Sequence, residues 1–284
     1  MIFHTYGNKE NKAVVLIHGM LTPWQIWNTA IEKFKNDYYV VVPELDAHTE
    51  ETPTVFHSVE EEAEQIRKYI VKELGGQVFL LAGLSMGGRI AATLAKNEDL
   101  RIENMVLDGA PLDKANGLMR AVTKASYKSI IKKSKMHDPK IMEQAKKDFL
   151  PEEMLPYYIK IAENMTTESV DNIIDSVFSQ FTFTKYQSDM RILYMHGTKG
   201  KEASVHKLAL KMKELKPRLR SGALRDWRTL NLPALSLSSG SAKWRDSSHD
   251  RLHPRKLQLL SDLLQAPVQN EEGSHAGIRV LRQR

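Results

Sequence analysis

The chain has 284 residues, of which 42% are hydrophobic and 27% charged, so it can bury the core of a large domain and is not a disordered chain. It contains no cysteine, which excludes a disulfide framework, a thiol nucleophile and a thiolate metal site. The net charge of +6 lies entirely in residues 218–284, where 12 Lys and Arg stand against 6 Asp and Glu. Residues 1–217 hold 29 basic and 29 acidic residues and are electrically balanced.

The apolar runs are all short. Met1–Lys12 is polar and lacks the apolar centre of a signal peptide. No run approaches the roughly 20 apolar residues that a membrane-spanning helix needs. We therefore expect a cytoplasmic protein with no membrane span.

Apolar strands alternate with amphipathic helices over the first 110 residues. Ser58 precedes three glutamates, the acidic first turn that the helix dipole favours, and Gly75 ends that helix. The alternation predicts an α/β fold, a mostly parallel sheet with helices on both faces. The predicted strands are Ala13–Ile17, Tyr38–Val42, Gln77–Ala82 and Asn104–Leu107, and the predicted helices include Asn28–Lys35 and Ile90–Ala95.

Residues 112–188 break this alternation. They are rich in lysine and helical in pattern, and Pro139, Pro151 and Pro156 divide them into three or four helices. The pattern predicts a helical cap inserted between two strands of one sheet.

The strand pattern then returns. Arg191–Met195 is a predicted strand and Ala203–Leu215 a predicted helix. We expect residues 1–111 and 189–217 to form one sheet-based core around the insertion.

The most informative stretch is Gly83-Leu84-Ser85-Met86-Gly87-Gly88, which directly follows one predicted strand and precedes a helix. A serine hydroxyl attacks a carbonyl when it is exposed on a tight turn beside a base. Gly83 and Gly87 leave room for such a turn. Ser85 is the candidate nucleophile, and the N–H of Met86 is a candidate oxyanion donor.

A second candidate donor follows the first predicted strand, in His18-Gly19-Met20. The N–H of Met20 is the natural choice. His18 is expected to brace this loop through hydrogen bonds and not to act as a base. Trp24 and Trp27 either line an acyl pocket or belong to the core.

The segments Val14–Gly19 and Gly83–Gly88, with their spacing, resemble the α/β-hydrolase superfamily, most closely small bacterial serine esterases and monoacylglycerol-lipase-like members. The resemblance covers residues 1 to about 216. It implies a small-molecule acyl substrate, no cofactor and no metal, and catalytic residues in the order nucleophile, acid, histidine. The two motifs are specific to the fold and do not identify a substrate.

The acid that the resemblance implies follows the predicted strand at 191–195. Members often have Gly-x-x-Asp there, whereas this chain has Gly200 at the aspartate position. Glu202 is the nearest carboxylate and the first candidate for the acid. Asp108 is the alternative, because some members supply the acid from that strand.

The resemblance places the histidine after one further strand, and no strand pattern is found beyond Pro217. Residues 218–284 contain no Phe or Tyr, and arginine replaces lysine as the main basic residue. One hypothesis is that this tail is translated out of frame and is disordered. If the tail is genuine, the base comes from His249, His253 or His275, of which His249 fits the family order best.

These observations favour a serine hydrolase that forms an acyl-enzyme on Ser85. Within that class, a C–C hydrolase, a lyase-like enzyme or an acyltransferase remains open. Two alternatives differ in class: a catalytically impaired protein of this fold that lacks its triad histidine, and a polyanion-binding protein that uses the Arg-rich tail. The rest of the chain has no RNA-binding motif, no phosphate-binding glycine loop and no metal-ligand spacing, so no nucleic-acid partner is expected. The sequence does not determine the oligomeric state.

Overall fold

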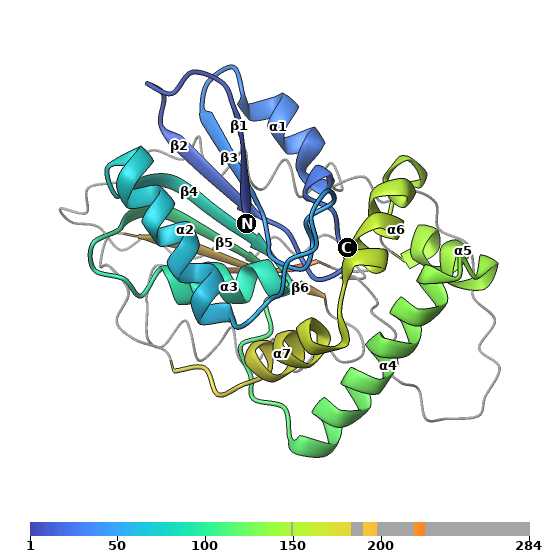
Figure 1. Ribbon diagram of the computed structural model, residues 1–284. Coiled ribbons are helices and arrows are strands. Elements are labelled where there is room, and N and C mark those ends of the chain that lie inside the picture. Colours follow the sequence, from blue (N-terminus) through green and yellow to red (C-terminus); the bar gives the residue numbers. More distant parts are fainter. Residues whose placement is uncertain (149, 183–189, 198–218, 225–284) are drawn as a thin grey trace, which may run out of the picture. The chain divides into compact units, whose positions relative to one another are not determined.

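The computed structural model describes residues 1–148, 150–182, 190–197 and 219–224 (Figure 1). Among these, seven strands form one sheet in the order β1-β3-β2-β4-β5-β6-β7. Only β1 runs antiparallel to its neighbour β3, and every other neighbouring pair is parallel. The strands are β1 (Ile2–Tyr6), β2 (Ala13–Ile17), β3 (Tyr39–Glu44), β4 (Gln77–Leu84), β5 (Arg101–Asp108), β6 (Arg191–Gly197) and β7 (Leu219–Leu224).

Strand β2 lies inside the sheet, between β3 and β4. All five of its residues are buried, which is why its sequence is a continuous apolar run and not an alternating one. The predicted α/β fold is therefore confirmed. The buried apolar side chains of the sheet and its helices form one core.

The direction of strand connection reverses after β3. The chain steps from β2 outward to β3, then crosses back past β2 to β4 and continues to β5. Right-handed crossovers then place α1 (Asn28–Phe34) on one face of the sheet and α2 (Val59–Leu74) and α3 (Met86–Leu94) on the other. In Figure 1, α2 and α3 lie side by side across the sheet, and both contact β4.

Helix α2 begins and ends where the sequence predicts. The hydroxyl of Ser58 accepts a hydrogen bond from the N–H of Glu61 at 3.0 Å, which caps the helix. Gly75 ends it in the left-handed conformation, with φ 60°. Helix α3 begins at Met86, four residues before the predicted start, because Gly87 and Gly88 belong to its first turn and not to a loop.

Helices α4 to α7 lie between β5 and β6 along the chain and form an insertion. Pro139 is the first residue of α5, and Pro156 lies in the first turn of α6, positions where the missing N–H of proline removes no helical hydrogen bond. None of the helices in the described ranges is long and apolar enough to cross a membrane. The elements of the insertion are α4 (Gly117–Lys135), α5 (Pro139–Asp148), η2 (Glu152–Met154), α6 (Leu155–Asn164) and α7 (Thr167–Val177), while η1 (Trp24–Trp27) precedes α1.

The N-terminal edge of the sheet was not predicted. Ile2–Tyr6 forms β1, whose residues are exposed or half-buried and pair with β3. Strand β3 also continues through Pro43 to Glu44, whereas the predicted strand ended before Pro43. Pro43 is tolerated because the ladder between β2 and β3 ends at Val41, so its missing N–H removes no bond to β2.

The expectation that no strand follows Pro217 was wrong. Leu219–Leu224 forms β7 and pairs in parallel with β6, from Ile192 opposite Leu219 to Gly197 opposite Leu224. This segment has weak β-propensity. The unpaired backbone groups along the outer edge of β6 supply the hydrogen bonds, so tertiary context overrides the local preference. The predicted helix at 203–215 and the rest of the tail lie outside the described residues.

Candidate active site

Ser85 occupies a strained turn between β4 and α3. Its φ of 50° and ψ of −113° are unusual for a residue with a side chain. The turn is held at both ends of the residue. The N–H of Ser85 donates to the carbonyl of Asp108 at 2.7 Å, and its carbonyl accepts from the N–H of Arg89 at 3.1 Å. This backbone conformation projects the side chain out of the strand–helix junction.

The glycines around Ser85 are required by close backbone approaches. A β-carbon on Gly83 would lie 2.3 Å from the carbonyl oxygen of Gly87. One on Gly87 would lie 2.3 Å from the carbonyl oxygen of Ile17. No side chain fits at either distance, so the elbow packs directly against the end of β2.

The loop that follows β2 lies beside Ser85. Strands β2 and β4 are parallel neighbours, with Ile17 opposite Gly83, so their carboxyl ends meet at one edge of the sheet. A β-carbon on Gly19 would lie only 3.6 Å from the β-carbon of Ser85. This is the point where the strand order reverses, the usual place for ligands in open α/β sheets.

The two candidate oxyanion donors flank this junction. Met86 is the first residue of α3, where a backbone N–H has no partner within the helix. Met20 belongs to the loop after β2. Within the described residues, neither N–H donates a hydrogen bond to another backbone or side-chain group.

His18 braces the loop, as predicted. It is completely buried, its Nε2 accepts the N–H of Leu45 at 3.1 Å, and its Nδ1 lies 2.9 Å from the carbonyl oxygen of Gly19. Nδ1 therefore carries the proton. Burial, reinforced by the neighbouring imidazole of His48, lowers the pKa of His18 to about 3. It is neutral at physiological pH and is not placed to act as a base.

His48 was not among the predicted site residues. Its ring is buried, its Nε2 accepts the N–H of Leu21 at 3.0 Å, and its Nδ1 lies 3.0 Å from the carbonyl oxygen of Asp46. Burial lowers the pKa of His48 to about 4. The sequence did hold a signal for His48, since it follows β3, the parallel neighbour of β2. Parallel neighbours end at the same edge of the sheet, so a histidine there lies near the loop after β2.

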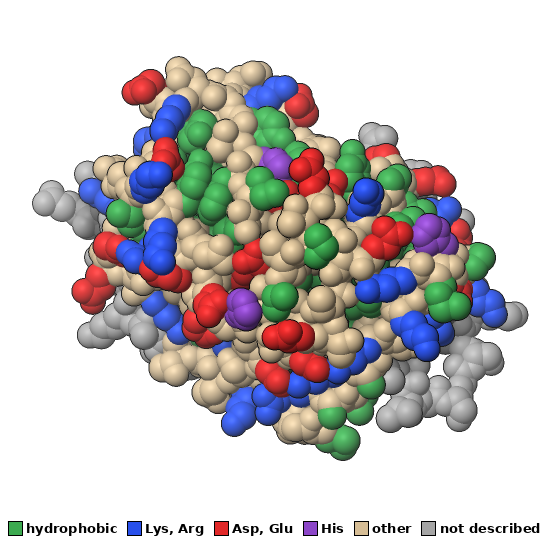
Figure 2. Space-filling model, viewed as in Figure 1, with side chains coloured by type: hydrophobic (Ala, Val, Ile, Leu, Met, Phe, Trp, Pro, Cys, Tyr) green, Lys and Arg blue, Asp and Glu red, His purple; other side chains and the backbone are tan. Residues whose placement is uncertain are grey.

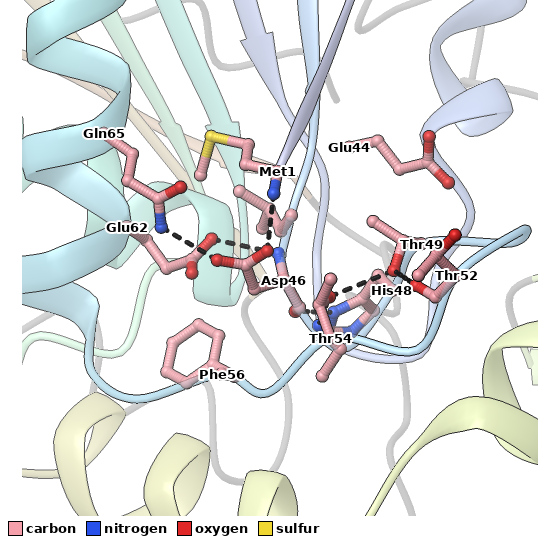
Figure 3. A network of polar contacts seen from close by, with 12 residues as sticks. Met1, Glu44, Asp46, His48, Thr49, Thr52, Thr54, Phe56, Glu62 and Gln65 are labelled. Atoms are coloured by element: carbon pink, nitrogen blue, oxygen red, sulfur yellow. Dashed lines mark hydrogen bonds and ion pairs between the residues drawn. The ribbon is translucent and has the colours of Figure 1, made fainter.

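A polar network holds the segment that carries His48 (Figure 3). Asp46 accepts a hydrogen bond from Gln65 at 2.8 Å and contacts the α-amino group of Met1, while its N–H donates to Glu62 at 3.2 Å. Burial and the adjacent carboxylate of Asp46 raise the pKa of Glu62 well above its usual value. Burial alone would raise the pKa of Asp46, but the hydrogen bonds from Gln65 and Met1 outweigh it and lower that pKa.

The remaining predicted residues are placed as follows. Asp108 is buried at the end of β5, opposite Leu84 in the sheet register. Trp27 is 4% exposed and belongs to the core, whereas Trp24 stacks on the ring of His4 with centroids 4.0 Å apart. Glu202, His249, His253 and His275 all lie outside the described residues.

The described part of the chain holds no group of three or more His, Asp or Glu that could bind a metal ion. Figure 2 shows acidic and basic side chains intermixed over the face in view. Two such ion pairs join α4 and α7, where Lys124 lies 2.6 Å from Asp175 and Lys128 lies 2.7 Å from Asp171. This mixing agrees with the balanced charge of residues 1–217.

Comparisons with known proteins agree with the fold. Residues 12–147 match the model of the α/β-hydrolase fold family. Among curated proteins, an AB hydrolase superfamily protein of Gibberella zeae is 22% identical over 109 residues, a match that spans 38% of this chain and 39% of that protein.

Solved structures share the fold at low sequence identity. An α/β-hydrolase family protein from Desulfitobacterium hafniense is 18% identical with a TM-score of 0.67, and the match covers 93% of this chain and 100% of that one. A thermophilic esterase from Thermogutta terrifontis is 17% identical with a TM-score of 0.63, covering 93% and 92%. The carboxylesterase CesB from Bacillus subtilis is 15% identical with a TM-score of 0.60, covering 92% and 86%.

The fold and the family match point to one class. The chain has the α/β-hydrolase fold, and its residues 12–147 match the model of that family.

Proposed function

We propose that this protein is a serine hydrolase that cleaves a carboxylic ester or a related acyl substrate through an acyl-enzyme on Ser85. The observation that carries the proposal is the strained conformation of Ser85 beside Gly19, with the amides of Met20 and Met86 at the same junction. A hydroxyl on such a turn can approach an acyl carbon while two N–H groups bind the developing oxyanion. Two of the structures that share the fold are an esterase and a carboxylesterase.

The proton-transfer groups are proposed from chain order. Strand β7 ends at Leu224, and the superfamily places its histidine after the strand in this position. His249 is the first histidine that follows β7 along the chain, so it is the proposed base. Glu202, which follows β6, is the proposed acid that orients it. The helices of the insertion are proposed to cap the site and shape the acyl pocket.

The proposal is tested by labelling with a fluorophosphonate probe and by hydrolysis of short p-nitrophenyl esters. We expect the wild-type protein and Ser129→Ala, which removes an exposed serine on α4, to take up one probe and to hydrolyse the ester. Ser85→Ala should show neither. An equal rate in Ser85→Ala, or an unlabelled and inactive wild-type protein, would contradict the proposal, and the second result would favour the catalytically impaired alternative.

The same assay tests the proposed base. His249→Ala should lower kcat by about three orders of magnitude or more, as loss of a triad member does, whereas His253→Ala should retain the wild-type rate. Equal rates in wild type and His249→Ala would exclude His249 as the base and leave Ser85 as nucleophile.

A further inference from the structure

Two loops at the active-site edge each contribute one buried histidine to the other loop. The loop after β2 supplies His18, whose Nε2 accepts the N–H of Leu45 in the loop after β3. The loop after β3 supplies His48, whose Nε2 accepts the N–H of Leu21 in the loop after β2. The two rings meet edge to face, with centroids 5.1 Å apart. We name this reciprocal pair, His18 with Leu45 and His48 with Leu21, the histidine clasp.

Each ring can play this part in only one tautomer. Both Nε2 atoms accept a backbone N–H, and both Nδ1 atoms lie within 3.0 Å of a carbonyl oxygen, that of Gly19 for His18 and that of Asp46 for His48. Both rings are therefore neutral with the proton on Nδ1. In a protonated ring Nε2 carries a hydrogen, so it could no longer accept the backbone N–H of the other loop.

The clasp fixes the peptide groups on both sides of Met20. The carbonyl oxygen of Gly19 accepts from His18 and, at 2.8 Å, from the hydroxyl of Thr22. In a planar trans peptide the N–H points opposite to the C=O, so holding this oxygen aims the N–H of Met20 the other way. The next N–H along the chain, that of Leu21, is held by His48.

The position of Leu21 gives His48 a specific task. Leu21 has a φ of 57°, which a leucine adopts only when its surroundings impose it. His48 itself is held firmly, because the N–H of Ala47 donates to Thr54 at 2.8 Å and the N–H of Asp46 donates to Glu62 (Figure 3). The loop after β3 is thus a fixed support for the loop after β2.

We propose that His48 is a positioning residue that holds the loop after β2 through Leu21 and so keeps the amide of Met20 aimed at the oxyanion. This inference rests on the proposed function of Ser85 and Met20. His48 acts through the loop and does not touch the substrate. Its loss should lower kcat more than it changes KM, because the oxyanion is bound more strongly in the transition state than in the ground state.

The experiment compares His48→Leu, His48→Gln and the control His57→Leu, which changes an exposed histidine. His48→Leu removes the acceptor for Leu21, and we expect kcat for a p-nitrophenyl ester to fall about 10- to 100-fold with KM changed by less than about threefold. His48→Gln can present its Oε1 near the place of Nε2 and should recover most of the rate. A change in KM with kcat unaltered would overturn the proposal. So would a folded His48→Gln variant that does not recover the rate.

A second readout does not depend on catalysis. NMR of ¹⁵N-histidine-labelled protein at pH 7 should show His48 as the Nδ1–H tautomer, and the amide of Leu21 should exchange with solvent much faster in His48→Leu than in wild type. An unchanged Leu21 exchange rate or the other tautomer would overturn the clasp. A wild-type protein with an intact clasp but no esterase activity would overturn the function of Ser85 instead, so the two failures are distinguishable.

Discussion

At the scale of single residues, burial shifts the pKa values of three side chains near the site. His18 and His48 are kept neutral because a charged imidazole would be desolvated, and desolvation of the carboxylate raises the pKa of Glu62. The role of His18 could be inferred from sequence because it follows the first strand directly. The role of His48 could not, since it depends on which N–H of another loop faces its ring.

The lowered pKa of His48 predicts a pH dependence of stability. A histidine whose folded pKa of about 4 lies below its unfolded value of 6.5 binds its proton more readily when unfolded. Stability is therefore fully present above pH 6.5 and is lost as the pH falls towards 4, by about 2 kcal/mol per such histidine at pH 5. The groups that face His48 are the imidazole of His18 and the carboxylates of Asp46 and Glu44.

Urea unfolding at pH 7.5 and pH 5 measures this loss. We expect the free energy of unfolding of wild type to fall by about 2 kcal/mol more over this interval than that of His48→Gln, which has no imidazole to protonate. Burial, the main cause of the lowered pKa of His18 and of the raised pKa of Glu62, is common to both proteins. Identical falls in the two proteins would show that His48 titrates alike in the folded and unfolded states.

At the scale of elements, α7 fastens the insertion to the segment that leads into α2. The hydroxyl of Ser169 accepts the N–H of Phe56 at 3.2 Å, the hydroxyl of Ser176 accepts the N–H of Val59 at 2.9 Å, and Asn172 donates to the carbonyl of Phe56 at 3.0 Å. These bonds satisfy backbone groups that no helix or strand could satisfy. The helices themselves were predictable from periodicity and prolines, but not their partners.

Removing one of these acceptors should loosen the segment locally. Ser176→Ala leaves the N–H of Val59 without its partner, so we expect a loss of about 1 to 2 kcal/mol of stability. Hydrogen exchange should show faster exchange of the Val59 amide, with Ser129→Ala as the exposed-serine control. Equal protection of the Val59 amide in wild type, Ser176→Ala and Ser129→Ala would mean that the hydrogen bond to Ser176 contributes nothing to stability.

At the scale of the whole described structure, Arg89 connects helix α3 to both ends of the insertion. It is 1% exposed, and its guanidinium donates to the hydroxyl of Ser179 at 2.9 Å and reaches the carbonyl of Pro111 at 3.4 Å. It also lies over the ring of Phe181, 4.6 Å from the centroid. Pro111 precedes the insertion helices and Ser179 follows them, so one side chain spans their two ends.

Truncating this side chain should therefore be costly. Arg89→Ala removes this donor from partly buried carbonyl and hydroxyl oxygens and opens a cavity where the buried guanidinium lay, and we expect the free energy of unfolding to fall by about 2 to 4 kcal/mol. Lys114→Ala, at an exposed position nearby, should change it by less than about 0.5 kcal/mol. Denaturant unfolding of the two variants decides the matter, and a similar small effect for both would contradict the linking role of Arg89.

The sequence by itself determined the α/β fold, the helical insertion, the position of Ser85 and the bracing by His18. These features depend on apolar periodicity, capping residues and short motifs, all of which are local. Only the tertiary structure decided that Ile2–Tyr6 and Leu219–Leu224 become edge strands, because backbone hydrogen bonds from a neighbouring strand give them their conformation. It also brought His48 to Leu21 and Arg89 to Ser179. Such pairings depend on which atoms the folded chain turns towards each other, and residue type and spacing do not specify that.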